Sequence, residues 1–247
     1  MMTSTEHQPM IAVGDRFENF LANPGTVAAS RVFDPAAGPD AGTPVVAGQG
    51  LSAEQLATLA GRTPADMPPP VPANAALTHK HQSRNVMIGV PADAGDGTYV
   101  AELILDERNE VIEDHLTGQH IPAVALIEAA RQTWTAVTER FLRQDAAALR
   151  FVVTDIAASF QQLVFPLPTT LHYELIECVP GRMQQTYRCR VRVRQNGRTA
   201  AEIRGTYLTV AENLSAKQEA LAARQAVARQ IAAASAATAR DRKDATS

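Results

Sequence analysis

The sequence predicts an α+β protein in which a curved antiparallel sheet wraps around one long central helix. Three observations support this prediction. Two runs rich in β-branched and apolar residues come first, at 85–90 and 98–105. A long apolar helix follows at 122–142, and four further strand-like runs come after it. A helix that is apolar on nearly all sides is most simply buried by a sheet that curves around it.

The composition is that of an ordinary globular protein. Of 247 residues, 45% are hydrophobic and 20% are charged, and the formal net charge is -3. This balance gives no general attraction to nucleic acid, and no apolar run is long enough to span a membrane. The first residues lack the basic and apolar regions of a secretory signal. We therefore expect a cytoplasmic location and neither a nucleic-acid nor a membrane partner.

Residues 1–75 are predicted to form an irregular N-terminal arm, because ten of the fifteen prolines lie there. One short helix is expected at 51–62, where Ser52 can cap the first turn and Gln55 stands three residues later. Such an arm can wrap onto the main domain or stay partly disordered. The functional alternative is a lid or a partner-docking segment.

The elements of the main domain follow in order within 76–212. A turn-rich segment joins the first two strands, and Pro122 is expected at the first position of the central helix. The last two strands are joined by Asn196-Gly197, a strong hairpin signal. The four strands after the helix are expected at 150–160, 170–179, 184–195 and 199–210. Two strands, one buried helix and four strands are the order of a single hot-dog fold.

Residues 213–247 are predicted to form an exposed, alanine-rich C-terminal helix that frays near its end, because thirteen alanines lie between 214 and 247. Docking to a partner is the alternative role. The two cysteines, Cys178 and Cys189, are expected to be small buried residues without a disulfide. In the expected hairpin, Cys178 would face roughly position 185.

Glu128 is the first candidate for chemistry, since it is the only polar side chain between Ile121 and Ala130. One interpretation is a structural ion pair with Arg131, one turn further along the helix. The other is a buried carboxyl that faces a substrate channel, with burial raising its pKa and Arg131 opposing that shift.

Four polar residues crowd in front of the helix: Asp114, His115, Gln119 and His120. The first amides of a helix lack partners, and the helix dipole adds positive charge there, so this end can bind a developing oxyanion. A histidine beside it can act as general acid or base. Each histidine alone is equally typical of a solvated loop or a helix cap.

A second histidine cluster, His79-Lys80-His81, precedes the first strand. Two histidines in a strand would share one face, but only two metal ligands are evident. We expect no metal ion and no organic cofactor, and prefer a basic entrance for a phosphorylated substrate or carrier.

Four arginines alternate with apolar residues later in the chain, which indicates a solvated outer face or a docking surface for an acidic carrier protein or a CoA phosphate. They are Arg188, Arg190, Arg192 and Arg194.

The segment DHLTGQHIPAVALIEAARQ, at 114–132, resembles the signature of the A-factor (γ-butyrolactone) biosynthesis hot-dog family. The run HKHQSRNVMI, at 79–88, resembles the opening of that family. The helix is similar, more distantly, to that of β-hydroxyacyl-carrier-protein dehydratases. The resemblance covers roughly 77–210.

This resemblance implies transfer of a β-ketoacyl group from acyl carrier protein to the hydroxyl of dihydroxyacetone phosphate. Matched by position, the implied catalytic residues are Glu128, His115, His120 and Asp114. The substrate-binding residues that we expect are His79 and Lys80, which match the family by position, with Arg131, Gln119, Pro122 and Ala123.

The chain departs from the family in two ways. Members commonly hold two hot-dog repeats, whereas only one is found here, so we expect a homodimer that completes the site. Ala123 stands where the family has glycine. We expect the thioester partner to be acyl carrier protein or acyl-CoA. A dehydratase, a thioesterase and a non-catalytic acyl-binding or synthase-partner module remain the alternative functions.

Overall fold

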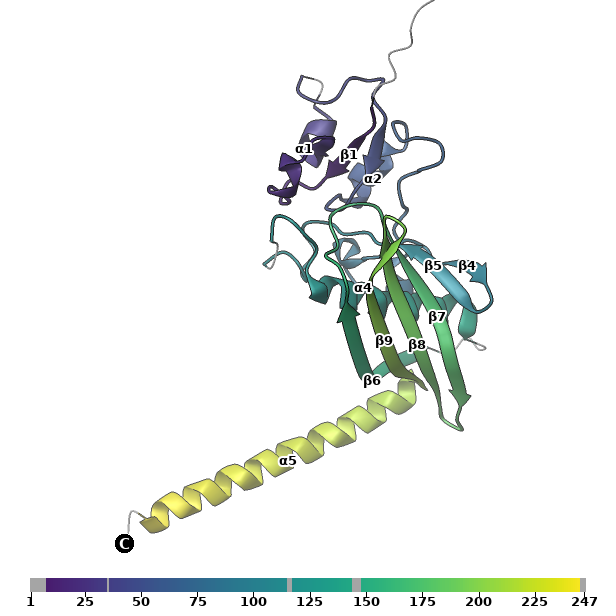
Figure 1. Ribbon diagram of the computed structural model, residues 1–247. Helices are drawn as coiled ribbons and strands as arrows, with labels where there is room; N and C mark the ends of the chain where they lie inside the picture. Colours follow the sequence, from purple (N-terminus) through teal and green to yellow (C-terminus); the bar gives the residue numbers. More distant parts are fainter. Residues whose placement is uncertain (1–7, 35, 115–116, 144–147, 245–247) are drawn as a thin grey trace, which may run out of the picture.

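Six antiparallel strands form the main sheet, and one long helix lies against its concave face (Figure 1). The computed structural model describes residues 8–34, 36–114, 117–143 and 148–244. The strand order is β4-β5-β7-β8-β9-β6. The strands are β4 (Ala92–Gly95), β5 (Thr98–Glu102), β6 (Leu149–Phe160), β7 (Thr169–Pro180), β8 (Gln184–Gln195) and β9 (Arg198–Ala211). This architecture confirms the predicted single hot-dog fold.

The long strands follow from period-two patterns in the sequence. In β8, Cys189, Val191 and Val193 are buried, whereas the arginines between them face outward. Asn196 and Gly197 both have positive φ, at 51° and 74°, and close the β8–β9 hairpin as a two-residue turn requires. The predicted hairpin is therefore confirmed.

The central helix α4 (Ala123–Val137) continues into a π-helical segment, η3 (Thr138–Leu142). Trp134 is fully buried and packs over β9 at Gly205, where a Cβ atom would lie 2.6 Å from the Trp134 Cζ3 atom. Pro122 occupies the N-cap, one position earlier than predicted. The Pro122 backbone is extended, with ψ of 145°, so Pro122 precedes the helix and is not part of it.

One face of α4 differs from the prediction of a helix buried on all sides. Ala123 and Val124 are exposed, and Ile127, Glu128 and Arg131 are half-buried. These positions recur at helical spacing, so they form one continuous stripe. The expectation of burial was wrong for this stripe, because apolar character alone does not tell which side of a helix the sheet leaves uncovered.

The N-terminal region also differs from the irregular arm that was predicted. It holds a parallel three-stranded sheet in the order β2-β1-β3 with its own apolar core, in which Val45 and Leu59 are fully buried. Its elements are β1 (Met10–Val13), η1 (Phe20–Ala22), β2 (Thr26–Ala28), α1 (Ala29–Val32), β3 (Val45–Ala47) and α2 (Ala53–Leu59). The expected helix is confirmed, and Ser52 and Gln55 form its capping box.

The linking segment between the N-terminal sheet and the main sheet contains α3 (Ala75–Thr78) and η2 (Ser83–Asn85). The strand predicted at 85–90 is not regular. Only isolated bridges occur there, joining Ile88 to Leu103 and Gly89 to Pro72. The predicted turn-rich segment supplies β4 instead, which pairs with β5.

Two further expectations concern the cysteines. Cys189 is buried, but Cys178 is exposed, so the prediction of burial was wrong for Cys178. Cys178 pairs with Tyr187 and not with position 185, because the connection is longer than the two-residue turn assumed: the pair nearest to it joins Pro180 to Gln185. Both thiols are free.

The C-terminal helix α5 (Glu212–Asp244) extends away from the rest of the molecule as a single rod (Figure 1). Its described side chains beyond Ser215 are exposed, including Leu221, Val227 and Ile231. Within the described ranges, no helix combines the length and the apolar character needed to cross a lipid bilayer.

Candidate functional site

The two motifs that carried the resemblance meet in space, although 48 positions separate Lys80 from Glu128. The Lys80 Nζ atom lies 2.5 Å from Glu128 Oε1. Arg131 donates from Nε to Glu128 Oε2 at 2.8 Å and from Nη2 to Glu128 Oε1 at 3.0 Å. One carboxylate therefore holds two cations at the open face of α4.

Glu128 is ionised in this setting. Burial raises the pKa of its carboxyl, but hydrogen bonds and charge from Arg131, together with hydrogen bonds from Lys80 and Gln132, outweigh burial and lower the pKa below its usual value. This geometry matches the ion-pair interpretation of Glu128. It does not provide the raised pKa expected of a general acid.

Gln132 explains why the helix motif ends in glutamine. Its side chain is fully buried, accepts from Met87 N at 2.8 Å and donates to Asn85 O at 2.9 Å. It also donates to Glu128 Oε1 at 3.1 Å. The irregular segment at 85–90 is thus fastened to the helix by side-chain hydrogen bonds in place of a continuous strand ladder.

His79 forms a second pair with a residue that the sequence did not single out. Its Nε2 atom lies 3.1 Å from Glu139 Oε1, and the Glu139 side chain is only 11% exposed. Arg143 pairs with the same carboxylate. The ring of His79 packs edge-on against Phe151 of β6, with centroids 5.2 Å apart. A carboxylate that binds one ring nitrogen orients the imidazole and favours its proton on that side.

The backbone places this pair. His79 ends α3 in the left-handed conformation, with φ of 55°, and Glu139 lies in the π-helical segment η3. Glu139 lies on the same helical face as Glu128, Arg131 and Thr135, because these positions are three or four residues apart. This spacing could have marked Glu139 as a candidate from the sequence. His81 is exposed and does not share a strand face with His79, so the strand assumed for the two histidines was wrong.

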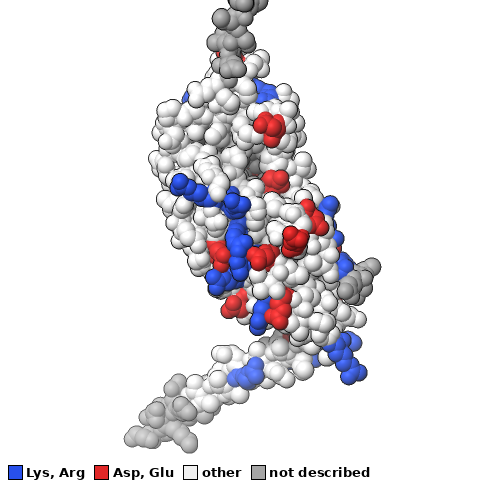
Figure 2. All heavy atoms as spheres, turned by 45° about the vertical axis from the view of Figure 1, so that its right-hand side comes forward, with Lys and Arg blue, Asp and Glu red and all other residues white. Residues whose placement is uncertain are grey.

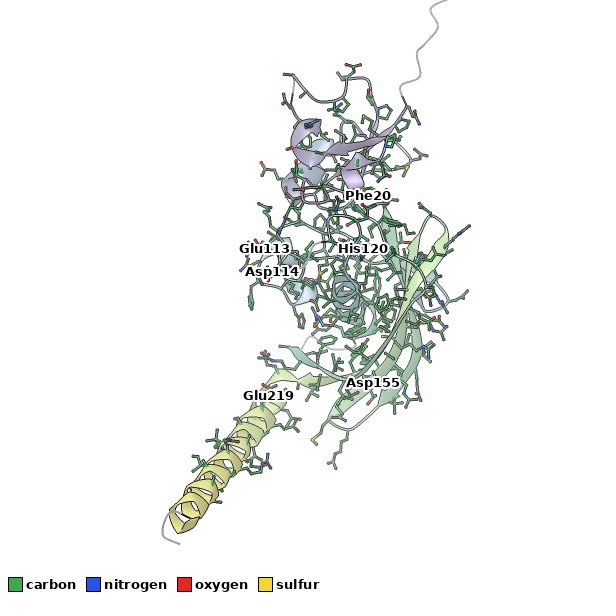
Figure 3. The ribbon with its side chains drawn as sticks, turned by 60° about the vertical axis from the view of Figure 1, so that its left-hand side comes forward. Phe20, Glu113, Asp114, His120, Asp155 and Glu219 are labelled. Atoms are coloured by element: carbon green, nitrogen blue, oxygen red, sulfur yellow. The ribbon has the colours of Figure 1, made fainter. Side chains whose placement is uncertain are left out.

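The described residues just before α4 form a hydrogen-bonded turn of their own. Thr117 holds the turn, accepting from the backbone amides of Gln119 and His120 at 3.2 and 3.0 Å. Its hydroxyl also lies 3.3 Å from His120 Nδ1. In Figure 3, His120 lies near α4, whereas Asp114 lies at the margin of the molecule. His115 falls outside the described residues.

Beside the open face of α4, strand β6 exposes apolar residues at the free edge of the sheet. Val153, Ile156 and Phe160 pair with inward-facing residues of β9, so they face the same side as the helix. They are nevertheless 39%, 43% and 45% exposed. Apolar side chains on an unpaired edge are a typical surface for association.

The arginine stripe lies on the opposite, convex face, where basic and acidic groups run side by side (Figure 2). Arg188 pairs with Glu177 at 3.0 Å, and Arg192 pairs with Glu174 at 3.0 Å. Arg190 lies 3.8 Å from both Glu174 and Glu202. Three of the four arginines are therefore balanced by carboxylates, as a solvated outer face would be.

The description of the family model that matches the chain is A-factor biosynthesis hotdog domain, and the match covers residues 61–211. No curated protein matches the chain. Among solved structures, a mutant thioesterase from Pseudomonas aeruginosa is 15% identical, with 65% of this chain and 95% of that chain covered and a TM-score of 0.38.

Two other solved structures are similarly distant. A conserved protein from Pseudomonas aeruginosa is 16% identical, covering 49% of this chain and 86% of that one, with a TM-score of 0.35. A hypothetical thioesterase with coenzyme A from Streptococcus pneumoniae is 14% identical, covering 49% and 84%, with a TM-score of 0.36. The family assignment rests on the family model, which spans more than half of the sequence. The chain belongs to the A-factor biosynthesis hotdog domain family.

Proposed function

We propose that the protein uses an acyl thioester and transfers a β-ketoacyl group from acyl carrier protein to a hydroxyl acceptor such as dihydroxyacetone phosphate. The observation that carries this proposal is the meeting of Lys80 with Glu128 and Arg131 on the uncovered face of α4, with the neighbouring His79 paired to Glu139. This cluster lies beside an apolar surface, which suits an acyl chain next to a phosphate.

The cations of the cluster support binding of the phosphorylated acceptor. Lys80 and Arg131 carry two positive charges against the single negative charge of Glu128. Each side chain is 24% exposed, so both are partly withdrawn from water but reachable. In this role Glu128 is a positioning residue, which holds the two cations for the phosphate.

His79 supports the chemical step as a general base. With Nε2 held by Glu139, its Nδ1 atom takes the proton of the acceptor hydroxyl. The hydroxyl oxygen then forms a bond to the thioester carbonyl carbon, and the carbon–sulfur bond breaks. The proton passes from His79 to the departing thiolate of the carrier, while the amides at the beginning of α4 favour the transient oxyanion.

A homodimer is part of the proposal, as expected for a chain with one hot-dog repeat. Support comes from the apolar edge strand β6 and the exposed start of α4, which a second copy would cover. Acyl-CoA is the alternative donor and uses the same thioester chemistry.

The proposal is tested by incubating the protein with a β-ketoacyl carrier thioester, with and without dihydroxyacetone phosphate. Ester product that forms only with the phosphate supports transfer. Release of free acid at the same rate in both reactions would instead indicate a thioesterase, and loss of water from a β-hydroxyacyl thioester would indicate a dehydratase. Binding without turnover of either thioester would indicate an acyl-binding module.

His79→Gln is expected to lower kcat by about 100-fold to 10,000-fold, because a positioned general base contributes about that much. The matched control is His81→Gln, two positions away and exposed, which is expected to change kcat by less than about twofold. The pH profile of kcat is measured for the wild-type protein and both variants. Equal effects of the two substitutions would exclude His79 as the base.

A further inference from the structure

A cavity lies on the convex side of the main sheet, opposite the face on which α4 and the Glu128 cluster lie. Its volume is about 540 Å³, within the range of small-molecule sites. Its walls come from three distant parts of the chain: β3 of the N-terminal sheet, the proline-rich segment 66–70, and the end of the main sheet around the β8–β9 turn. The two sheets therefore build this cavity together.

One wall of the cavity carries a row of polar residues from adjacent strands. Glu102 of β5 pairs with Thr170 of β7, and Thr170 pairs with Arg194 of β8. Directly paired residues point to the same face, so the three side chains stand side by side on the convex surface. Glu102 and Arg194 are thus about 10 Å apart at the backbone, since neighbouring strands are about 4.8 Å apart.

Arg194 differs from the other arginines of its stripe. Arg188, Arg190 and Arg192 each have a carboxylate partner, whereas Arg194 has none among the residues described and donates only to Gly197 O, at 3.1 Å. Its positive charge faces the cavity uncompensated by an ion pair. An anion is the group that would complete its coordination.

His172 lies beside Arg194 in the lining and bonds through Nε2 to Thr170 Oγ1 at 3.0 Å. Burial, with the positive charges of Arg194 and Arg192, lowers the pKa of His172. The ring is therefore neutral near pH 7 and offers a hydrogen bond without adding charge. Asp66 and Glu102, also in the lining, repel an anionic group, so only a ligand that places its single negative charge against Arg194 suits the cavity.

Much of the remaining wall is apolar. Met67, Pro68 and Pro70 of the proline-rich segment line the cavity together with Leu103 and Pro168 of the main domain. Prolines hold this segment with little conformational freedom, so the apolar wall is largely formed before any ligand arrives.

We infer that this cavity is a second ligand site, for a small molecule with an apolar body and a single anionic group that Arg194 binds. The site is separate from the proposed acyl-transfer cluster and does not depend on that proposal. Its ligand is recognised by the charge of Arg194, the polar row on the sheet and the apolar proline-rich wall.

The test uses three probes with the same eight-carbon chain: octanoate, 1-octanol and octylammonium. Binding is followed by backbone amide shifts of the ¹⁵N-labelled protein. Octanoate is expected to bind most tightly and to shift amides at Thr170, His172 and Gly197. Arg194→Gln is expected to weaken octanoate at least about tenfold, as expected for a charge-assisted hydrogen bond, and to leave 1-octanol within about twofold.

The matched control is Arg188→Gln, in the same stripe but outside the cavity and paired with Glu177, which is expected to leave octanoate binding unchanged. Met67→Ser is expected to weaken octanoate and 1-octanol alike. Octanoate that shifts only amides near Glu128, that binds no better than 1-octanol, or that is indifferent to Arg194→Gln would overturn the inference. None of these results bears on ester formation in the transfer assay.

Discussion

Glu128 keeps its charge in a half-buried position because two cations and an amide surround it. A free carboxylate there would be costly, and a carboxyl with a raised pKa would leave Lys80 and Arg131 unbalanced. The Glu128 carboxylate therefore acts by electrostatic attraction: it holds in place two cationic side chains that come from different parts of the chain.

Glu128→Gln is expected to lower the free energy of unfolding at pH 7 by about 2 kcal/mol, between the values for exposed and fully buried pairs. Because the pKa of Glu128 is lowered in the folded protein, its contribution is present above the unfolded pKa, about 4.3, and is lost as the pH falls through the folded pKa. The gap to the wild-type protein should therefore close below about pH 4.

Urea unfolding of both proteins at pH 7 and at pH 3 measures this gap. The matched control is Glu110→Gln, which removes an exposed pair with Arg84 and is expected to cost less than about 0.5 kcal/mol. An undiminished gap at pH 3 would contradict the ionised state of Glu128.

The two cysteines are expected to react at very different rates with iodoacetamide at pH 8. Cys178 is exposed, whereas burial raises the pKa of Cys189 to about 12 and keeps it a thiol. Mass spectrometry of the native protein should show one rapid modification, on Cys178. The Cys178→Ser variant should then react only after unfolding, and equal labelling of both thiols would contradict this expectation.

At the scale of elements, contact between α4 and β9 depends on a missing side chain. Gly205→Ala places a methyl group about where the Trp134 ring already lies, with Cζ3 only 2.6 Å from the ideal Cβ position. We expect a loss of about 1–3 kcal/mol in the free energy of unfolding, as overpacking usually costs.

The control for this substitution is Gly61→Ala, since a Cβ at Gly61 meets nothing within 4 Å. Urea midpoints of the two variants provide the comparison. A similar effect at both positions would mean that backbone freedom, and not contact with Trp134, determines the cost.

The elements that the sequence predicted well have strong local patterns. The β8–β9 hairpin has period-two alternation and an Asn-Gly turn, and α2 has its capping box, so both could be read within a few residues. The parallel strands β1, β2 and β3 are three or four residues long and pair across distant positions. Nothing local marks such pairing, and the prolines around these strands indicated irregular structure instead.

In the candidate site, too, local contacts could be predicted from the sequence and long-range contacts could not. Arg131 is one helical turn from Glu128, so their pairing was predictable from spacing. Lys80 reaches Glu128 only because α3 packs on α4, and Glu139 reaches His79 for the same reason. Residue type and resemblance marked His79 and Lys80, but long-range packing decides what they contact.

At the scale of the whole molecule, the free edge of β6 predicts association. Ile156→Lys is expected to shift the proposed dimer to monomer, because it places a charge on the exposed apolar face beside α4. Ile176→Lys is the matched control, since Ile176 is 49% exposed on β7, away from that edge. Sedimentation equilibrium over a range of concentrations measures the change, and a wild-type protein that stays monomeric throughout would contradict the expected dimer.

The outstretched α5 has a practical effect on how such measurements are made. A helix of 33 residues is about 50 Å long, and here it stands clear of the body. A particle with such an appendage drags more water and diffuses more slowly than a sphere of equal mass. On a gel-filtration column, one copy will therefore elute early, where a heavier compact protein is expected, so elution volume alone would overstate the number of subunits.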